Sequence, residues 1–311
     1  MISKGTFLDE VSHDIPHQNW GREEWERDFR FMKNIGIDTV ILIRAGYGKW
    51  QTFPSKILMQ QEGVYKPPVD LVKMFLELAD KYNMSFYFGL YDSGKYWIQN
   101  NFKKEVDLNK LFIDEVWETY GDFPAFKGWY VSHEFNRKSG RLIDLYAGLA
   151  KHCKNVSNGL PVLISPYIDG IKNINQYTLE TRKGNGISLN QHETEWSEIF
   201  DGIKDAVDIV AFQDGHVEFD ELTDFLLVNK TLADKFGIEC WTNSETFDRD
   251  MPIKFMPIKW EKLLLKLEMA AKAGISHAIT FEFSHFMSPQ SAYLQAGHLY
   301  NRYKDYIKGL S

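Results

Sequence analysis

FKGWYVSHEFN, residues 126–136, passes from an apolar run into a group of polar side chains. Phe126, Trp129 and Val131 are aromatic or β-branched residues, which buried strands favour. Burying a carboxylate is costly unless it has a partner or a task, so Glu134 is a conspicuous residue to find after such a strand. The stretch therefore predicts a buried strand with a candidate acid at its C-terminal end.

A second stretch shows the same change from apolar to polar residues. In ECWTNSETF, residues 239–247, apolar Cys240 and Trp241 also give way to polar side chains. Glu245 follows the apolar part, and Glu239 at the start of the stretch is its rival as a functional carboxylate. The two stretches together predict a pair of glutamates, Glu134 and Glu245, each at the end of a strand.

The rest of the chain alternates between strand and helix patterns. DTVILIRA, residues 38–45, is a nearly continuous apolar run, typical of a strand buried on both faces in a parallel sheet. Residues 21–36 carry apolar side chains at helical spacing and end in glycine. The predicted strands are residues 4–14, 38–45, 85–92, 126–136, 161–169, 208–216, 239–247 and 277–283. The predicted helices are residues 21–36, 69–82, 107–119, 142–156, 190–204, 220–236, 259–273 and 291–306.

Eight strands alternating with eight helices predict an α/β fold, a single (β/α)8 TIM barrel. No Gly/Ser/Pro-rich linker or shift in composition divides the sequence, so we expect one domain over residues 1–311. A doubly wound open sheet is the main alternative. The strand count and the lack of a GxGxxG turn in the sequence disfavour it.

The composition excludes several classes of protein. Hydrophobic residues make up 44% and charged residues 25%, which is ordinary for a globular protein. A net charge of −7 argues against a nucleic-acid partner, and no apolar run approaches the ~20 residues of a membrane span. The start, MISKGTFLDE, lacks a signal-peptide pattern, although a trimmed chain would look the same, so the location stays open. Oligomeric state also stays open.

Active sites of such barrels lie at the C-terminal ends of the strands. Carboxylates, aromatic rings and amides dominate these positions here, and the sequence contains no HExxH motif, nucleophile elbow or phosphate-binding glycine loop. We expect a carbohydrate substrate and no cofactor or metal. The predicted substrate-binding residues are Asp9, His13, Trp20, Arg44, Trp50, Tyr91, Trp97, His133, Asn136, Tyr167, Gln213, His216, Trp241, Asn243 and Glu282.

Glycoside hydrolysis uses a pair of carboxyl groups. One protonates the departing oxygen, while the other attacks the anomeric carbon or activates water. Strands four and seven of a closed barrel face each other across its mouth, which would place Glu134 and Glu245 on opposite sides of a bound sugar. Carboxyl groups ~5–5.5 Å apart would retain the sugar configuration, and ~6.5–9.5 Å would invert it. Arg44 is a candidate to orient a carboxylate, either Glu134 or an acidic group of the substrate.

The arrangement resembles the retaining glycosidase superfamily of (β/α)8 barrels, which carries its acid/base on strand four and its nucleophile on strand seven. This resemblance implies that Glu134 is the acid/base and Glu245 the nucleophile. That superfamily typically ends strand four in Asn-Glu, whereas this sequence has His133-Glu134. More closely, four stretches resemble the DUF4434 family of glycosidase-like barrels. These stretches are GTFLDEVSHDIPHQNWG (5–21), IDTVILIRAGYG (37–48), FKGWYVSHEFN (126–136) and WTNSETF (241–247).

Two other functions are compatible with the same residues. A divalent-metal sugar isomerase would use carboxylates and imidazoles from several strand ends as ligands. The residues available for such a site are His133, Glu134, Asp214, His216 and Glu245. A catalytically inactive carbohydrate-binding barrel would keep the aromatic residues but would need no titrating pair.

Overall fold

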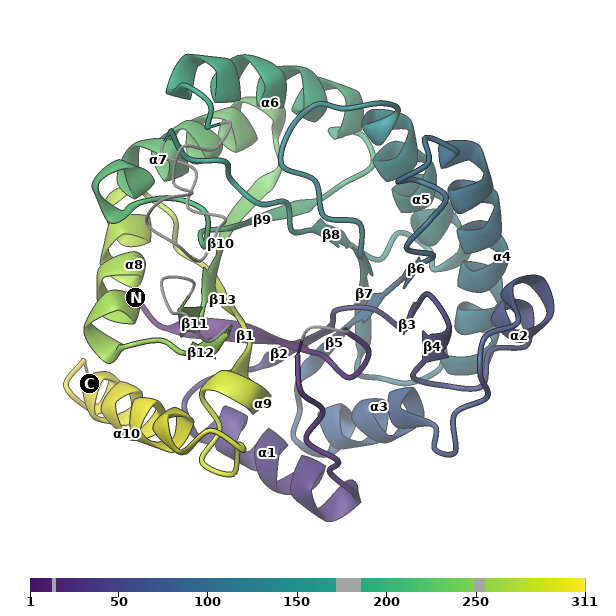
Figure 1. Ribbon diagram of the computed structural model, residues 1–311, viewed down its shortest axis with the longest axis horizontal. Helices are drawn as coiled ribbons and strands as arrows, with labels where there is room; N and C mark the ends of the chain where they lie inside the picture. The colour runs from purple at the N-terminus through teal and green to yellow at the C-terminus, as the bar shows by residue number, and fades with distance from the viewer. Residues whose placement is uncertain (13–14, 172–185, 249–254, 311) are drawn as a thin grey trace.

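The computed structural model describes residues 1–12, 15–171, 186–248 and 255–310. Eight parallel strands close into a barrel in the order β1-β13-β10-β9-β8-β7-β5-β2 (Figure 1). The predicted (β/α)8 barrel is therefore confirmed. Its strands are β1 (Ser3–Leu8), β2 (Thr39–Leu42), β5 (Ser85–Gly89), β7 (Phe126–Val131), β8 (Val162–Ile164), β9 (Ile209–Gln213), β10 (Glu239–Glu245) and β13 (Ala278–Phe281).

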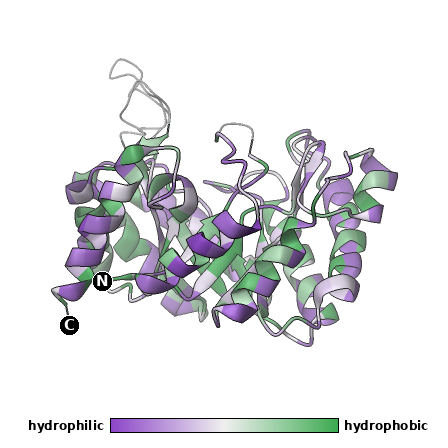
Figure 2. Ribbon diagram, turned by 90° about the horizontal axis from the view of Figure 1, so that it is seen from below, coloured by the Kyte–Doolittle hydropathy of each residue, from purple (hydrophilic) through white to green (hydrophobic). Residues whose placement is uncertain are grey.

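An outer ring of helices surrounds the barrel (Figure 1). Their apolar faces pack on the strands, and Figure 2 shows hydrophilic residues on their outer surfaces. None of the helices in the described part of the chain is long and apolar enough to cross a membrane. The ring comprises α1 (Arg22–Asn34), α3 (Leu71–Lys81), α4 (Phe102–Tyr120), α5 (Leu142–Val156), α6 (Leu189–Ile203), α7 (Phe219–Phe236), α8 (Trp260–Lys272) and α10 (Leu294–Lys308).

Side chains fill the inside of the barrel. Alternate residues of each strand point inward, as the two-residue period of a strand requires. Glycine is needed at Gly89 and Gly128, where a Cβ atom would lie 1.9 Å from the Leu42 carbonyl oxygen and 2.3 Å from the Tyr87 ring. The inner cluster consists of Phe7, Ile41, Ile43, Tyr87, Tyr130, Leu163, Ile209, Ala211, Trp241 and Ile279. Because these side chains fill the barrel interior, we expect a substrate to bind at its rim.

The structure differs from the predicted elements mainly in the connections. Residues 46–68, between the strand predicted at 38–45 and the helix predicted at 69–82, contain a hairpin of β3 (Gly46–Tyr47) and β4 (Trp50–Gln51), followed by the helix α2 (Lys56–Glu62). β3 also pairs in parallel with β6 (Tyr91–Asp92). Such short elements depend on contacts between distant segments, so a local pattern does not reveal them.

Three further differences concern element ends and short elements. α4 begins five residues before its predicted start because Asn101 caps it, accepting a hydrogen bond from the Lys104 backbone N–H at 3.3 Å. The predicted strand at 161–169 is only three residues long. A two-stranded sheet of β11 (Phe247–Asp248) and β12 (Met256–Pro257) and a short helix, α9 (Phe283–Phe286), were not predicted.

Candidate active site

A cavity of ≈ 360 Å³ opens at the C-terminal ends of the barrel strands. Its polar lining comes from the last residues of several strands and from the segments that follow them. Its apolar lining includes three phenylalanines. The described lining residues are Ser12, Ile15, Ile43, Arg44, Tyr47, Asp92, Trp97, Glu134, Tyr167, Gln213, His216, Glu245, Phe247, Phe255 and Phe281.

Both predicted catalytic glutamates line this cavity. Glu134 follows the end of β7, and Glu245 is the last residue of β10. The side chain of Glu134 is 27% exposed, whereas Glu245 as a residue is 2% exposed. The negative charge of Glu245 contributes to raising the pKa of Glu134, so the two carboxyl groups influence each other across the cavity.

The register of β10 explains why Glu245 reaches the cavity. Trp241, Asn243 and Glu245 occupy alternate positions of the strand and share its inner face. Trp241 belongs to the inner cluster, Asn243 donates a hydrogen bond to the Ser165 hydroxyl at 3.1 Å, and Glu245 lines the cavity above them. A shift of one residue would turn Glu245 away from the cavity.

Glu134 lies beside a guanidinium group. Arg44 Nη2 is 3.2 Å from Glu134 Oε2, and Arg44 Nε is 3.7 Å from Asp92 Oδ2. The Arg44 side chain also donates a hydrogen bond to Ser12 Oγ at 3.2 Å, and its guanidinium lies 5.5 Å from the centre of the Tyr47 ring. Of the two targets predicted for Arg44, the structure shows the pairing with Glu134.

The surroundings of Glu134 favour its protonated form. Burial raises its pKa, Arg44 lowers it, and the charges of Asp92, Asp9 and Glu245 raise it again, leaving the pKa above its ordinary value. Arg44 is a cation, and when Glu134 is ionised its charge and that of Asp92 outweigh the effect of burial and raise the pKa of the guanidinium. A carboxyl group with a raised pKa keeps its proton to a higher pH than an ordinary one, as a proton donor requires.

A buried ion pair contacts the backbone of Glu245. Its backbone N–H donates to Asp214 Oδ1 at 3.1 Å, and its carbonyl accepts from Lys266 Nζ at 3.2 Å. Lys266 Nζ also lies 2.7 Å from Asp214 Oδ1. Lys266 and Asp214 are 6% and 1% exposed, so this pair links α8 to the end of β10 from inside the protein.

Lys266→Met should destabilise the protein by about 3–5 kcal/mol, because it leaves Asp214 buried without its cation. Burial raises the pKa of Asp214 and Lys266 lowers it, so the variant carboxyl should protonate more readily. A raised pKa costs stability as pH rises, so the loss should shrink as pH falls. Urea unfolding of the variant and the parent at several pH values measures this difference in the free energy of unfolding.

Lys262→Met is the matched control on the same helix. Lys262 pairs with Asp248 at 2.5 Å but is 32% exposed, so its loss should cost less than about 1 kcal/mol. The double variant Lys266→Met/Asp214→Asn should recover part of the stability. Equal losses for Lys266→Met and Lys262→Met would contradict the burial argument.

Behind Glu134 lies a second buried pair. His133 Nε2 is 2.9 Å from Glu105 Oε1, and both residues are fully buried. Burial would lower the pKa of His133, but the hydrogen bond and charge of Glu105 outweigh burial and raise it. The predicted substrate contact His133 is thus turned toward α4, and supports the backbone next to Glu134.

Among the described residues, Asp92, Glu105 and His133 have ligand atoms close enough together to suit a metal ion. Several of their side-chain atoms are engaged with protein partners. Glu105 accepts from His133 and Ser93, and Asp92 Oδ1 accepts from the Trp97 indole N–H at 2.7 Å. In the ligand set considered for an isomerase, His133 contacts Glu105 and Asp214 contacts Lys266, so these two side chains are directed to different partners.

Four other predicted substrate-binding residues line the cavity with Arg44. They are Trp97, Tyr167, Gln213 and His216. Trp97 packs against Phe135 with 5.0 Å between ring centroids, and Tyr167 meets His216 edge-on at 4.9 Å. Gln213 donates to the Ser165 carbonyl at 2.7 Å. Together these side chains form polar and aromatic walls around the two glutamates.

The structure places several predicted substrate-binding tryptophans and tyrosines elsewhere. Trp20 packs edge-on against Trp25 of α1 at 5.1 Å. Tyr91 is 1% exposed and donates its hydroxyl to the Gly48 carbonyl at 2.7 Å. Trp241 stacks on His277 at 3.8 Å near the start of the barrel strands, because residue 241 lies early in β10. Trp50 is on the surface, 62% exposed.

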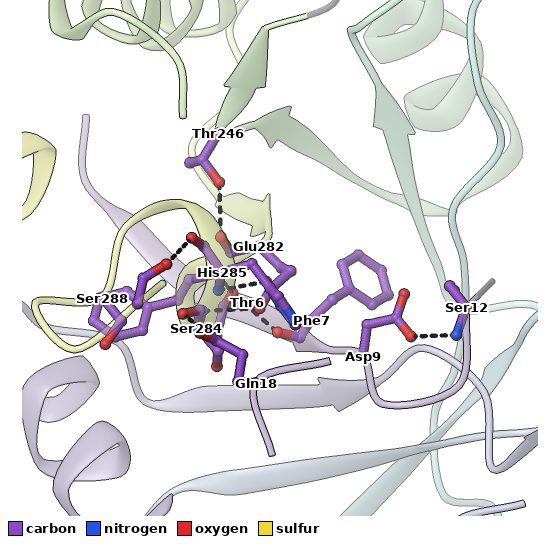
Figure 3. A network of polar contacts seen from close by, with 12 residues as sticks. Thr6, Phe7, Asp9, Ser12, Gln18, Thr246, Glu282, Ser284, His285 and Ser288 are labelled. Atoms are coloured by element: carbon purple, nitrogen blue, oxygen red, sulfur yellow. Dashed lines mark hydrogen bonds and ion pairs between the residues drawn. The ribbon is translucent and has the colours of Figure 1, made fainter. Parts of the chain in front are cut away.

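The remaining predicted residues hold the rim together. Asn136 donates to Asp169, and Asp9 accepts from the backbone of Val11 and Ser12. Glu282 accepts from the backbone N–H groups of Ser284 and His285 at 2.8 and 2.7 Å (Figure 3). His285 pairs with Glu282. Burial lowers the pKa of His285, but the neighbouring charges, that of Glu282 first, outweigh burial and raise this pKa to about 9. His13 lies outside the described residues.

Eight of the described lining residues are not among the predicted site residues. Asp92 ends the strand predicted at residues 85–92, and Tyr47 follows the strand predicted at residues 38–45 by two residues, so both lie where active-site residues of a barrel are expected. The apolar residues resembled core residues because burial and substrate contact demand the same side chains. The omitted residues are Ser12, Ile15, Ile43, Tyr47, Asp92, Phe247, Phe255 and Phe281.

The chain matches the DUF4434 family, described as a domain of unknown function, over residues 3–293, which confirms the resemblance expected from sequence. No curated protein matches the chain. One similar structure is that of a "putative alpha-L-fucosidase" from Bacteroides thetaiotaomicron VPI-5482. It is 58% identical, with a TM-score of 0.93, and the match covers 99% of this chain and 93% of that chain.

Two more distant structures share the fold. An endo-1,4-beta-D-mannanase from Thermotoga petrophila RKU-1 has a TM-score of 0.57 at 10% identity, with 97% of this chain and 99% of that chain covered. A family 1 b-glucosidase from Thermotoga maritima has a TM-score of 0.53 at 10% identity, with 84% and 77% covered.

Proposed function

We propose that this chain, which belongs to the DUF4434 family, is a retaining glycoside hydrolase in which Glu134 is the acid/base and Glu245 the nucleophile. The observation that carries the proposal is that the two glutamates line one cavity in unlike surroundings. The pKa of Glu134 is raised, as a proton donor requires. Backbone contacts to Asp214 and Lys266 orient Glu245.

The proposed reaction has two steps. Protonated Glu134 donates its proton to the glycosidic oxygen while the Glu245 carboxylate attacks the anomeric carbon, so the leaving sugar departs as an alcohol and a glycosyl ester forms on Glu245. Glu134, now ionised, removes a proton from water as its oxygen attacks the anomeric carbon. The ester breaks, Glu245 is again a carboxylate, and the sugar leaves with its original configuration.

The proposed substrate is an α-L-fucoside, the class named for the relative at 58% identity. Fucose is a 6-deoxy sugar, with a methyl group where most hexoses carry a hydroxymethyl group. The cavity has an apolar part that includes Phe247, Phe281 and Ile15, and a polar part that includes Gln213 and His216. An apolar wall favours a methyl group over a hydroxyl group, which would have to be desolvated.

The test compares 4-nitrophenyl α-L-fucoside with 4-nitrophenyl α-L-galactoside, which differs by a single 6-hydroxyl group. We expect hydrolysis of the fucoside at a kcat/KM at least about tenfold higher. NMR of the first product should show the α-anomer before mutarotation. Release of the β-anomer would overturn the retaining mechanism, and preference for the galactoside would overturn the deoxy-sugar specificity.

Arg44→Gln should move the alkaline limb of the kcat/KM profile to higher pH. Arg44 lowers the pKa of Glu134, so without this cation the pKa rises further and the acid stays protonated to a higher pH. The alkaline limb of kcat/KM reports the acid in the free enzyme. The measurement is kcat/KM for the aryl fucoside across the pH range.

Arg44→Lys is the control, because it keeps a positive charge beside Glu134 and should leave the limb closer to its original position. A limb that stays in place in Arg44→Gln, or moves to lower pH, would show that Glu134 is not the group that titrates.

A further inference from the structure

Two exposed aromatic side chains lie together on the segment that follows β2. Trp50 is 62% exposed and Tyr65 is 59% exposed, and their ring centroids are 5.2 Å apart. Hydrophobic side chains scattered singly on a surface need no explanation, whereas adjacent exposed apolar side chains are a candidate binding surface. Trp50 and Tyr65, called the aromatic platform below, form such a surface.

The β3–β4 hairpin connects the platform to the cavity. Tyr47 and Trp50 are directly opposed residues of this antiparallel pair, so their side chains project from the same face, with Cβ atoms about 4.5–5.5 Å apart. Tyr47 lines the cavity. In Figure 1, β3 lies on the side of the barrel axis and β4 lies farther out. The aromatic surface therefore continues outward from the cavity rim through Tyr47 to the platform.

Hydrogen bonds fix the backbone that carries these rings. The Gly48 carbonyl accepts from the Tyr91 hydroxyl at 2.7 Å, and the Gly48 N–H donates to the Asp92 carbonyl at 3.1 Å. The Tyr65 N–H donates to the Lys49 carbonyl at 2.9 Å, and its carbonyl accepts from Gln51 Nε2 at 3.0 Å. A ligand that meets rings on a fixed backbone loses less binding free energy to ordering the protein.

The platform lies on the side of the cavity that holds the proposed acid. Arg44 links the two, since its guanidinium pairs with Glu134 at 3.2 Å and lies over the Tyr47 ring at 5.5 Å. The acid protonates the oxygen of the leaving group, so the leaving group must lie on the side of Glu134. A leaving group longer than one sugar unit would extend from this side toward Tyr47 and Trp50.

We infer that Trp50 and Tyr65 form a subsite that stacks on the leaving-group sugars of an oligosaccharide substrate. This inference rests on the proposed function, because Glu134 as the acid defines the leaving-group side. Aromatic rings present flat apolar surfaces to the C–H faces of pyranose rings, and no charged side chain is required. The platform thus adds affinity for substrates with two or more sugars beyond the cleaved bond.

The test uses two substrates that differ in their leaving groups. 4-Nitrophenyl α-L-fucoside has a small aryl leaving group, whereas 2′-fucosyllactose has a disaccharide. Trp50→Ala and Tyr65→Ala should each lower kcat/KM for 2′-fucosyllactose roughly tenfold, mainly through KM, and leave the aryl fucoside nearly unchanged. Leu227→Ala, at another exposed apolar residue (51%), is the control and should change neither. Equal effects on both substrates, or no effect, would overturn the inference.

A binding measurement separates failure of this inference from failure of the proposed function. The probe is an array of immobilised plant, microbial and host oligosaccharides, exposed to Glu245→Gln and to Glu245→Gln/Trp50→Ala proteins. Binding that requires Trp50 in a protein that hydrolyses no glycoside would keep the platform and remove the hydrolase. If 2′-fucosyllactose is hydrolysed equally well with and without Trp50, the hydrolase stands and the platform fails. An array that captures neither protein would also overturn the platform.

Discussion

Glu245→Gln should lower turnover of an aryl fucoside by about three orders of magnitude or more, with the fold intact. The amide is nearly the same size as the carboxylate but cannot attack the anomeric carbon, so no glycosyl ester forms. The Asp214 and Lys266 contacts are made to the backbone of residue 245 and should survive. Steady-state kinetics measures the turnover, and thermal unfolding, expected at an unchanged temperature, checks that the fold is intact.

Glu239→Gln is the matched control for the nucleophile. Glu239 begins the same strand, and its carboxylate accepts a hydrogen bond from the Trp241 indole N–H at 2.7 Å, at the opposite end of β10 from the cavity. This variant should keep turnover within a few-fold of the parent. Near-normal turnover in a folded Glu245→Gln protein would eliminate the assigned nucleophile.

Added azide identifies the role of Glu245 independently. In Glu245→Ala an azide ion has room to attack the anomeric carbon from the vacated side in a single displacement. The expected product is a glycosyl azide with the inverted, β-configuration, detected by NMR. A rescued product with retained configuration would instead assign the residue to proton transfer.

Glu134→Gln should lower turnover of substrates with a sugar leaving group by about 10²–10⁴-fold. A sugar alkoxide leaves poorly without a proton, and the amide cannot supply one. The first step with 2,4-dinitrophenyl α-L-fucoside should lose much less, because its phenolate departs unprotonated. The measurement is kcat/KM, which reports this first step, for the two substrates side by side.

The pH profile gives the second readout for Glu134. Burial and neighbouring charges raise its pKa, so in the parent the protonated acid persists to a higher pH than for an ordinary carboxyl group. Activity should fall as pH rises through that pKa, and this alkaline limb should disappear in Glu134→Gln. Equal losses for both leaving groups, with the limb unchanged, would remove Glu134 from the acid role.

The barrel could be predicted from the sequence because strand and helix periodicities are local. The apolar run at residues 38–45 indicates a buried strand, and the structure has β2 within it. The helix predicted at residues 142–156 has the same bounds as α5. Glu134 and Glu245 were candidates for the same reason, since a polar group after an apolar strand is visible in the order of residues. Their catalytic roles stay predictions.

The choice among aromatic residues was harder. Trp97 and Trp241 both looked like rim residues, yet Trp97 lines the cavity and Trp241 packs inside the barrel. The difference depends on where a strand starts and on the conformation of the segment after it. Element ends are the least certain part of a sequence-based assignment, so such residues are the first to be misplaced.

By itself, the sequence determined the order of strands and helices, the closed barrel, and two carboxylates at strand ends, because hydrophobic periodicity and chain order are properties of neighbouring residues. Only the tertiary structure decided what surrounds those carboxylates. The contacts of Arg44 with Glu134, of Lys266 with Asp214, and of the β3–β4 hairpin with β6 join segments far apart in the chain. Such contacts form when the whole barrel closes, and no local pattern encodes which distant side chain will fill each position.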